Sequence, residues 1–567
     1  MTYSFKKDGR YLIALLLLAG LIFGFGLGSF GLLDPDEPFY SLTAKEMIQK
    51  HDLSTPILFG QPQFEKPIFF YWVICLCFKI FGISEFASRL GPFLAGILTV
   101  LVTYLWGVIL FKRRQIAFVS AIILATAAEF MVVSRIVLTD IYLCFFITLA
   151  LFCFSLGYEN IKLRNKGWFF IFVFCSLGFL TKGPVAVIFP WMGIIGFLVM
   201  NRETALLKQF PWFFGVLAFC AIGLSWYVLM TVKYGTDFLG HFFIHENVRR
   251  FFFAEHKSSD KLFFYPGALF IGFFPWSAFL LASLFYGFRR AFGTKQGVFY
   301  RSLLLLSLFF ISTFLFLTFA KSKLLSYIVP VFPAVALMIG AWMSLAYRAV
   351  WRGATLKFSV RFLSFLFWGI LPLGLVIGGV IYNSKNKMDL FWPLFSIGAL
   401  LIPLSWTALW SLWKKQCQRA FYLMVAAAGF SYVIVFGWLM STADGVFSSK
   451  KDAVLYGQLT SGRSSTLILG NKLFVRGAAY YTGNEQVGVL TGDPEGAFYT
   501  KHPIPMISKL EDLMKIDKKL FPVYCFLKSK DLKLLKQIAN DKFSVKTLQE
   551  TANRVFVELD RADVSIF

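Results

Sequence analysis

The sequence predicts a polytopic α-helical membrane protein with about thirteen transmembrane helices and a soluble α/β domain at its C-terminal end. Hydrophobic residues make up 57% of the 567 residues and charged residues only 15%, whereas soluble proteins carry about 25% charged residues. Apolar runs long enough to cross a bilayer recur as far as residue 441, and the composition then becomes polar. These observations exclude a cytosolic enzyme, a disordered chain and a disulfide scaffold.

The first predicted span covers residues 11–33 and follows the basic residues Lys6, Lys7 and Arg10. The apolar run is too long for a signal peptide, and no small-x-small cleavage site follows it. We therefore expect a retained helix whose N-terminal end lies in the cytoplasm.

Twelve further apolar runs have the length of a membrane helix. They lie at 86–111, 116–134, 140–158, 167–181, 184–200, 210–231, 264–288, 301–319, 325–347, 362–382, 391–413 and 420–441. One more apolar run, at 67–83, is ambiguous by hydropathy alone.

The basic clusters resolve this ambiguity, because Lys and Arg collect in the cytoplasmic loops of membrane proteins. If 67–83 crossed the membrane, all the later basic clusters would lie outside. If it lies at the outer surface, they all lie inside. We therefore expect residues 34–85 to form one long outer loop with interfacial helices, and the C-terminus to lie outside. The clusters are at 112–114, 162–166, 289–290, 348–357 and 414–415.

The chain divides into a membrane domain at 1–441 and a soluble domain at 442–567. The second part is rich in Lys, Asp, Gly and Ser. Short β-rich runs at 465–469, 523–527 and 555–559 alternate with helix-like stretches such as 531–539. This alternation predicts a small α/β domain on the outer face.

Charged residues of both signs gather in the predicted outer loops. Cations suit a phosphate or pyrophosphate. Carboxylates suit a general base, a developing cationic sugar ring or a metal. Together they point to a polyprenyl-phosphate ligand whose tail lies in lipid and whose head lies outside. The polar and charged residues of these loops include Asp34, Asp36, Glu37, Glu65, Lys66, Arg135, Thr139, Asp140, Lys182, His241, His245, Glu246, Asn247, Arg249, Arg250, Lys321, Lys323 and Tyr327.

The outer-loop motifs resemble those of the bacterial aminoarabinose transferases, which modify lipid A and belong to the wider protein-mannosyltransferase-like superfamily. The resemblance covers roughly the first 340 residues. It is carried by Asp34-Pro35-Asp36-Glu37 with Tyr40, Phe64-Glu65-Lys66-Pro67 with Tyr71-Trp72, Thr139-Asp140, Thr181-Lys182-Gly183, Arg250-Phe251, and Lys321-Ser322-Lys323-Leu324 with Tyr327.

This resemblance implies an inverting glycosyltransferase of the GT-C type in the bacterial inner membrane, with its active site and C-terminal domain in the periplasm. The donor would be a sugar on undecaprenyl phosphate, and the transfer that of 4-amino-4-deoxy-L-arabinose or a related sugar to lipid A. No nucleic-acid partner is expected, and we expect a monomer.

The resemblance also implies roles for individual residues. Lys66 and Arg250 would hold the lipid phosphate, assisted by Tyr327 and Lys182. Asp36, Glu37 and Asp140 would be the catalytic carboxylates, near the sugar and the acceptor. Glu65 and His245 would be the ligands of a divalent metal (Zn, Mg or Mn).

The sequence departs from the family pattern at one position. Those transferases often carry a histidine three residues before the Arg-Phe pair, where this chain has Asn247. His245 lies two residues earlier, so it is either a metal ligand or a structural hydrogen-bonding group.

Two other functions stay open from the sequence. One is transfer of a hexose from the same class of donor to another glycan or to protein. The other is a transporter or flippase, although transporters hold ionisable groups near the bilayer midplane and often show repeated halves, whereas these charges gather at one face.

The proposed topology predicts that a cysteine at position 112 and one in the C-terminal domain lie on opposite sides of the membrane. This follows because eleven predicted spans, an odd number, lie between the two positions; since 67–83 does not cross in that topology, position 112 is the cytoplasmic one. Labelling with a membrane-impermeant thiol reagent tests the prediction. Labelling of both positions from the same side would rule out the thirteen-span arrangement.

Overall fold

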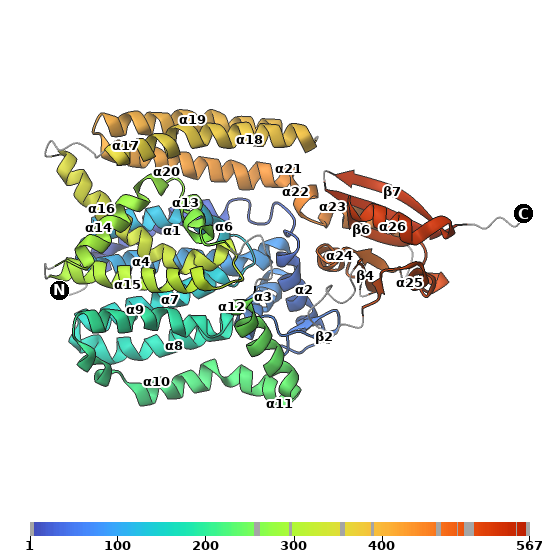
Figure 1. Cartoon of the computed structure of the whole chain (residues 1–567), viewed down its shortest axis with the longest axis horizontal. Helices are drawn as coiled ribbons and strands as arrows, with labels where there is room; N and C mark the ends of the chain where they lie inside the picture. The colour runs from blue at the N-terminus through green and yellow to red at the C-terminus, as the bar shows by residue number, and fades with distance from the viewer. Residues whose placement is uncertain are drawn as a thin grey trace, which may run out of the picture.

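The computed structural model describes residues 5–253, 261–293, 297–351, 358–386, 390–460, 466–484, 486–492, 504–551 and 553–562. Helices run along the long axis of the molecule, and a small sheet domain lies at one end (Figure 1). The expected fold class, a helical membrane protein with a C-terminal α/β domain, is confirmed.

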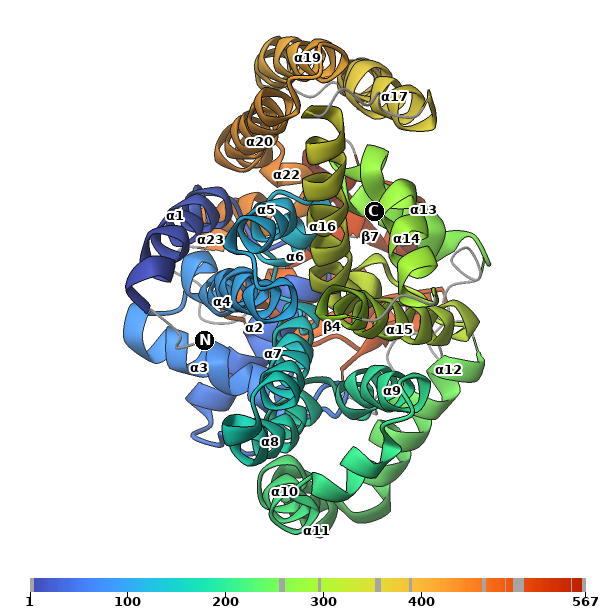
Figure 2. The same ribbon diagram turned by 90° about the vertical axis from the view of Figure 1, so that its left-hand side faces the viewer.

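Within the described residues, eight helical segments are long and apolar enough to cross a membrane. Seen end-on, α4, α7 and α16 lie near the centre, while α17, α19 and α20 group together on one side (Figure 2). The elements of these segments are α4 (Glu85–Phe111), α7 (Asp140–Glu159), η1 (Ile161–Leu163) with α8 (Arg164–Lys182), α15 (Val298–Phe319), η5 (Leu325–Val331) with α16 (Phe332–Trp351), α17 (Phe358–Ser364) with η6 (Phe365–Ile370) and α18 (Leu371–Asn386), α19 (Phe391–Trp413), and α20 (Cys417–Ile434) with η7 (Val435–Leu439) and α21 (Met440–Thr442).

Two bent pairs raise this number to ten at most among the described residues. The first joins α10 (Trp212–Ala218) and η3 (Phe219–Gly223) to α11 (Ser225–Leu239) with a bend of 46°. The second joins α13 (Phe264–Gly272) to α14 (Ser277–Ala291) with a bend of 116°. Pro275 lies at this second break, where it cannot donate a helical hydrogen bond.

The expected number of thirteen spans is therefore not confirmed, although each apolar run forms helix. The run at 116–134 is interrupted between α5 (Arg114–Ala125) and α6 (Ala128–Val133), and α9 (Val185–Met200) has 16 residues. Helix α1 (Phe5–Gly24) carries several charges in its first two turns. A hydropathy profile does not reveal such interruptions, because the residues on both sides of each break are apolar.

The first loop forms two helices at the end of the bundle that carries the sheet domain (Figure 1). Helix α2 (Asp36–Gln49) is followed by a hairpin of β1 (Ile57–Leu58) and β2 (Gln61–Pro62), and then by α3 (Ile68–Phe81). The 14 residues of α3 span about 21 Å, which is short of the roughly 30 Å hydrocarbon core of a bilayer.

Buried tryptophans in the bundle have their indole N–H groups satisfied within the protein. Lipid offers no hydrogen-bond acceptor, so each such group needs an internal partner. The bonds run from Trp106 to Ser155 Oγ (2.9 Å), from Trp168 to the Phe154 carbonyl (3.2 Å), from Trp276 to Thr126 Oγ1 (2.9 Å) and from Trp368 to the Pro275 carbonyl (2.6 Å).

The C-terminal domain is a six-stranded sheet with the order β5-β4-β3-β6-β8-β7. Strands β5, β4, β3 and β6 are parallel, whereas β8 is antiparallel to both β6 and β7. Helices lie on both sides (Figure 1), and β6 is therefore apolar on both faces. The strands are β3 (Ile468–Gly470), β4 (Val487–Leu490), β5 (Met506–Ile507), β6 (Val523–Lys528), β7 (Phe543–Thr551) and β8 (Arg554–Arg561).

Short helices complete both domains. In the membrane part they are η2 (Thr204–Gln209), η4 (Gly240–Arg249) and α12 (Arg250–Phe252). In the C-terminal part they are α22 (Asp444–Phe447), α23 (Lys450–Thr460), α24 (Val475–Thr482), α25 (Leu510–Met514), η8 (Lys518–Leu520), α26 (Asp531–Ala539) and η9 (Asn540–Lys542).

A buried ion pair attaches the sheet domain to the first outer loop. Arg554, the first residue of β8, donates to Asp34 at 2.8 Å, and both side chains are almost completely buried. Ser449 donates to the same carboxylate oxygen at 2.7 Å. The Asp444 carboxylate accepts a hydrogen bond from the Gly31 N–H at 2.7 Å. The two domains are thus joined by charge-assisted hydrogen bonds.

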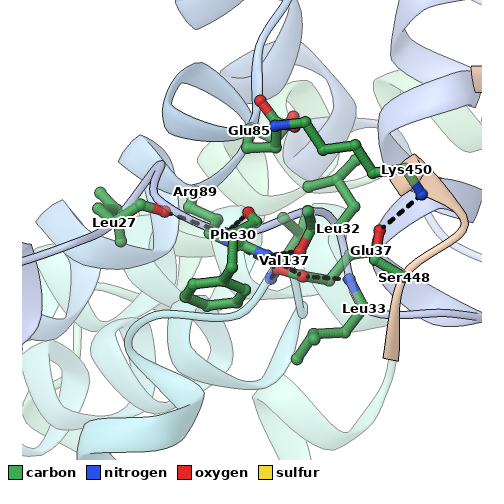
Figure 3. A network of polar contacts seen from close by, with 12 residues as sticks. Leu27, Phe30, Leu32, Leu33, Glu37, Glu85, Arg89, Val137, Ser448 and Lys450 are labelled. Atoms are coloured by element: carbon green, nitrogen blue, oxygen red, sulfur yellow. Dashed lines mark hydrogen bonds and ion pairs between the residues drawn. The ribbon is translucent and has the colours of Figure 1, made fainter. Parts of the chain in front are cut away.

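A second buried pair, Arg89 with Glu37, organises the loop itself (Figure 3). The shortest nitrogen–oxygen distance is 2.6 Å and neither side chain is exposed. Arg89 also donates to the carbonyls of Leu27, Phe30 and Gly31 at 2.7–3.0 Å. The pair therefore fixes the end of the first helical segment against α2 and α4.

Arg89→Met should lower the free energy of unfolding by about 3–5 kcal/mol, because it leaves the Glu37 carboxylate buried without its cation. Lys450→Met is the matched control. It removes a partly exposed pair with Glu85 (2.7 Å) and should cost at most about 1 kcal/mol. Thermal unfolding in detergent measures both. Equal melting temperatures for the two variants would contradict the structural role of Arg89.

Candidate active site

A pocket of about 130 Å³ lies between the first outer loop, the starts of α7 and α9, and the segment around the end of α15. Four of the residues singled out from the sequence line it, although they come from three separate loops. The lining residues are Glu65, Lys66, Pro67, Leu143, Lys182, Val185, Phe189, Phe242, Phe251, Phe316, Leu317, Ala320, Ser322 and Tyr327.

Lys66 enters the pocket from the extended segment between β2 and α3. Pro67 follows it and favours an extended backbone at Lys66. Gln63 braces this segment, since its side-chain oxygen accepts the Glu65 N–H at 3.0 Å and its amide donates to the Tyr71 hydroxyl at 2.6 Å. Glu65 and Lys66 are half-buried. The Phe64-Glu65-Lys66-Pro67 motif is thus an extended segment, held in place by Gln63, that positions a cation and a carboxylate in the wall of the pocket.

Asp140 and Lys182 form an ion pair at the wall of the pocket. Asp140 is the first residue of α7 and Lys182 the last residue of α8, so each charge complements the dipole of its helix. Gly183 follows with φ +83°, a backbone angle that glycine adopts at low cost after a helix. Lys182 Nζ also lies 4.0 Å from the centre of the Tyr327 ring, a cation–π distance.

Asp36 begins α2 and remains accessible to solvent. The surrounding protein nevertheless displaces enough water to raise the pKa of its carboxyl group. Arg476 and Lys66 oppose this shift, while Glu37 and Asp140 add to it. The charges of Lys66 and Asp140 thus influence Asp36, although Asp36 is not among the residues that line the pocket.

Glu37 has a different environment from its neighbour. Its two oxygens accept hydrogen bonds from Arg89, from the Leu33 N–H at 2.7 Å and from the Val137 N–H at 2.9 Å, and the side chain is fully buried. This geometry uses both oxygens of Glu37 in structural contacts, and its expected catalytic role stays a prediction. The sequence motif alone does not distinguish the environments of the adjacent carboxylates Asp36 and Glu37.

The side chains of His245 and Arg250 lie outside the described part of the structure, so their expected roles stay predictions. Their backbone belongs to η4 and α12. The next residue, Phe251, lines the pocket, and its carbonyl accepts the Lys321 N–H at 3.0 Å. Among the residues that can be assessed, no group of three or more His, Cys, Asp or Glu side chains is arranged to hold a metal.

Two features of the site were missed from the sequence. Arg476 belongs to α24 of the sheet domain and lies 4.3 Å from the Phe39 ring centre. Its positive charge opposes the rise in the pKa of Asp36. Only the docking of the two domains brings it there. The aromatic walls, such as Phe189 and Phe316, could not be picked out among 70 phenylalanines.

Comparisons with known proteins identify relatives of the chain. Residues 10–238 match the family described as dolichyl-phosphate-mannose-protein mannosyltransferase. An uncharacterized protein of Aquifex aeolicus is 32% identical over 383 residues, which is 67% of this chain and 81% of that protein. A Proteus mirabilis protein named undecaprenyl phosphate-alpha-4-amino-4-deoxy-L-arabinose arabinosyl transferase 1 is 30% identical over 384 residues, which is 65% of this chain and 67% of that protein.

Solved structures share the fold. The apo structure of ArnT from Cupriavidus metallidurans matches with a TM-score of 0.77 over 97% of this chain and 98% of its own, at 19% identity. The structure of the same protein bound to undecaprenyl phosphate matches with a TM-score of 0.74 over both full chains. Together with the sequence relatives, these findings confirm the resemblance of the outer-loop motifs. The chain belongs to the family of the undecaprenyl phosphate-aminoarabinose arabinosyl transferases, which are membrane glycosyltransferases of the GT-C type.

Proposed function

We propose that this protein transfers 4-amino-4-deoxy-L-arabinose from undecaprenyl phosphate to a phosphate of lipid A. The proposal rests on the pocket, which is lined by Lys66, Lys182 and Tyr327 and has aromatic walls. A lysine cluster suits the donor phosphate, and aromatic and aliphatic walls suit a polyprenyl chain. The name of the Proteus relative and the ligand of the Cupriavidus structure point to the same donor.

The reaction breaks the bond between the sugar C1 atom and a phosphate oxygen of the donor. Negative charge grows on the departing undecaprenyl phosphate, and the Lys66 ammonium group stabilises it. The acceptor phosphate attacks C1 from the opposite face, which inverts the configuration. It is already anionic and needs no strong base. Asp36 and Asp140 would stabilise the developing positive charge of the sugar ring, with Lys182 holding Asp140 in place.

We also propose that the pocket faces the periplasm from the bacterial inner membrane, and that the protein acts as a monomer. This orientation is supported by the basic residues in the loops at the opposite end of the bundle, because Lys and Arg collect in cytoplasmic loops. The pocket and the sheet domain lie at the same end of the bundle.

A second candidate function is transfer of a hexose to another glycan or to protein. It is supported by the match of residues 10–238 to the mannosyltransferase family. With a hydroxyl acceptor, Asp36 would be the general base. The transporter alternative loses its basis, because the chain belongs to a glycosyltransferase family.

Lys66→Ala should lower the transfer rate about tenfold to a hundredfold, because a charge-assisted hydrogen bond to the phosphate is worth roughly 1.5–3 kcal/mol. The purified protein would be assayed with an undecaprenyl-phosphate-linked aminoarabinose donor. Lys50→Ala is the control, since Lys50 lies in the same loop and donates to the Gly60 carbonyl at 3.2 Å. Normal turnover of Lys66→Ala, with an unchanged melting temperature, would remove Lys66 from the site.

Asp36→Asn distinguishes the two acceptor classes. With a lipid A phosphate as the acceptor, the rate should fall by less than about a hundredfold, because no general base is required. A hydroxyl acceptor would need that base, and losing it costs about 10²–10⁴-fold. The measurement is the transfer rate to lipid A with Lys66→Ala as the reference variant. A loss above a thousandfold, with normal donor binding, would contradict phosphate as the acceptor.

A further inference from the structure

A second pocket, of about 260 Å³, lies in the sheet domain at the carboxyl ends of β3, β4 and β6. It is built from the residues that directly follow each strand. Asn471 and Lys472 come after β3, Thr491 and Gly492 after β4, and Lys528 and Lys530 from the end of β6.

The topology makes this position a binding crevice. After β3 the chain passes through α24 to β4 on one side, whereas after β6 it passes through α26 to β7 and β8 on the other side. The connections thus diverge between the neighbouring strands β3 and β6. In open α/β sheets, ligands bind outside the carboxyl ends of the strands at such a switch point.

The charges of the pocket favour an anion. Lys472, Lys528 and Lys530 face one carboxylate, that of Asp531. The Asn471 side-chain amide donates to Asp531 at 2.5 Å, so part of this acceptor is already used. Burial lowers the pKa of Lys528, and the neighbouring cations, Lys530 first, add to this effect. An anion between the lysines would relieve their repulsion.

The pocket lies at the end of the sheet that docks on the membrane domain. Lys528 pairs in register with Arg554, and Arg554 forms the buried ion pair with Asp34. From Asn471, a short loop leads into α24, whose Arg476 interacts electrostatically with Asp36 of the first outer loop. The pocket therefore lies on the side of the sheet domain that meets the membrane domain, and its lining residues differ from those of the Lys66 pocket.

We propose that this crevice binds a phosphate monoester group through Lys472, Lys528 and Lys530. Lysine ammonium groups donate charge-assisted hydrogen bonds to phosphate oxygens. The group comes either from a lipid headgroup or from a soluble phosphate. This inference is independent of the proposed transferase reaction, because it concerns a separate pocket in the other domain.

The test compares two variants of the full-length protein in phosphatidylcholine nanodiscs, both in a Lys66→Ala background that weakens the first pocket. Lys528→Gln with Lys530→Gln removes two pocket lysines. Lys518→Gln with Lys519→Gln removes two exposed lysines elsewhere in the same domain. One arm titrates glucose 1-phosphate, and the other places phosphatidic acid in the nanodisc. Binding in only one arm identifies the source of the phosphate.

The pocket double variant should bind the effective probe at least about tenfold more weakly than the control variant. Equal binding by the two variants in both arms would overturn the proposal. Lysine methylation followed by mass spectrometry gives a second readout on the unsubstituted protein, so the test does not depend on the folding of the variant. The probe should protect Lys472, Lys528 and Lys530, and unchanged methylation of all three would also overturn the proposal.

Discussion

The buried pair of Glu37 and Arg89 is the interaction on which the rest of the outer face depends. Transferring two charges out of water is expensive, and the cost is offset only where every donor and acceptor finds a partner. Here Arg89 reaches backbone carbonyls after α1, while Glu37 accepts two backbone N–H groups. The pair therefore joins α1, α2, α4 and the loop before α7. Because Asp36 is the neighbour of Glu37, the same pair also fixes the start of α2, where Asp36 lies.

The site is assembled from the ends of secondary-structure elements. Asp140 starts α7 and Lys182 ends α8, so the helix dipoles favour both charges where the bundle meets water. Lys66 comes from a loop stiffened by Pro67, and Arg476 comes from the docked sheet domain. Charges at the bilayer surface cost less than charges at its centre. A phosphate can thus be held by cations while its hydrocarbon chain remains in lipid.

Much of this arrangement could be predicted from the sequence, and the failures have physical causes. The β-rich runs at 523–527 and 555–559 became β6 and β8, because short apolar runs rich in β-branched and aromatic residues are typical of strands buried on both faces. The motifs singled out Lys66, Lys182 and Tyr327, and these three residues line one pocket in the structure. The break between α13 and α14 was missed, since both halves are apolar. The ion pair of Glu37 was not predicted, because its partner, Arg89, lies 52 residues away in the sequence. The position of Arg476 became visible only through domain docking.

The central claim is that the Lys66 pocket holds the phosphate of a polyprenyl-phosphate donor. The most direct measurement is a cryo-electron microscopy structure of the full-length protein in nanodiscs with undecaprenyl phosphate. We expect phosphate density within hydrogen-bond distance of Lys66 Nζ, beside Lys182 and Tyr327, and lipid-chain density along Phe189 and Phe316. Phosphate density elsewhere on the protein, with the Lys66 pocket closed to the lipid, would contradict the account.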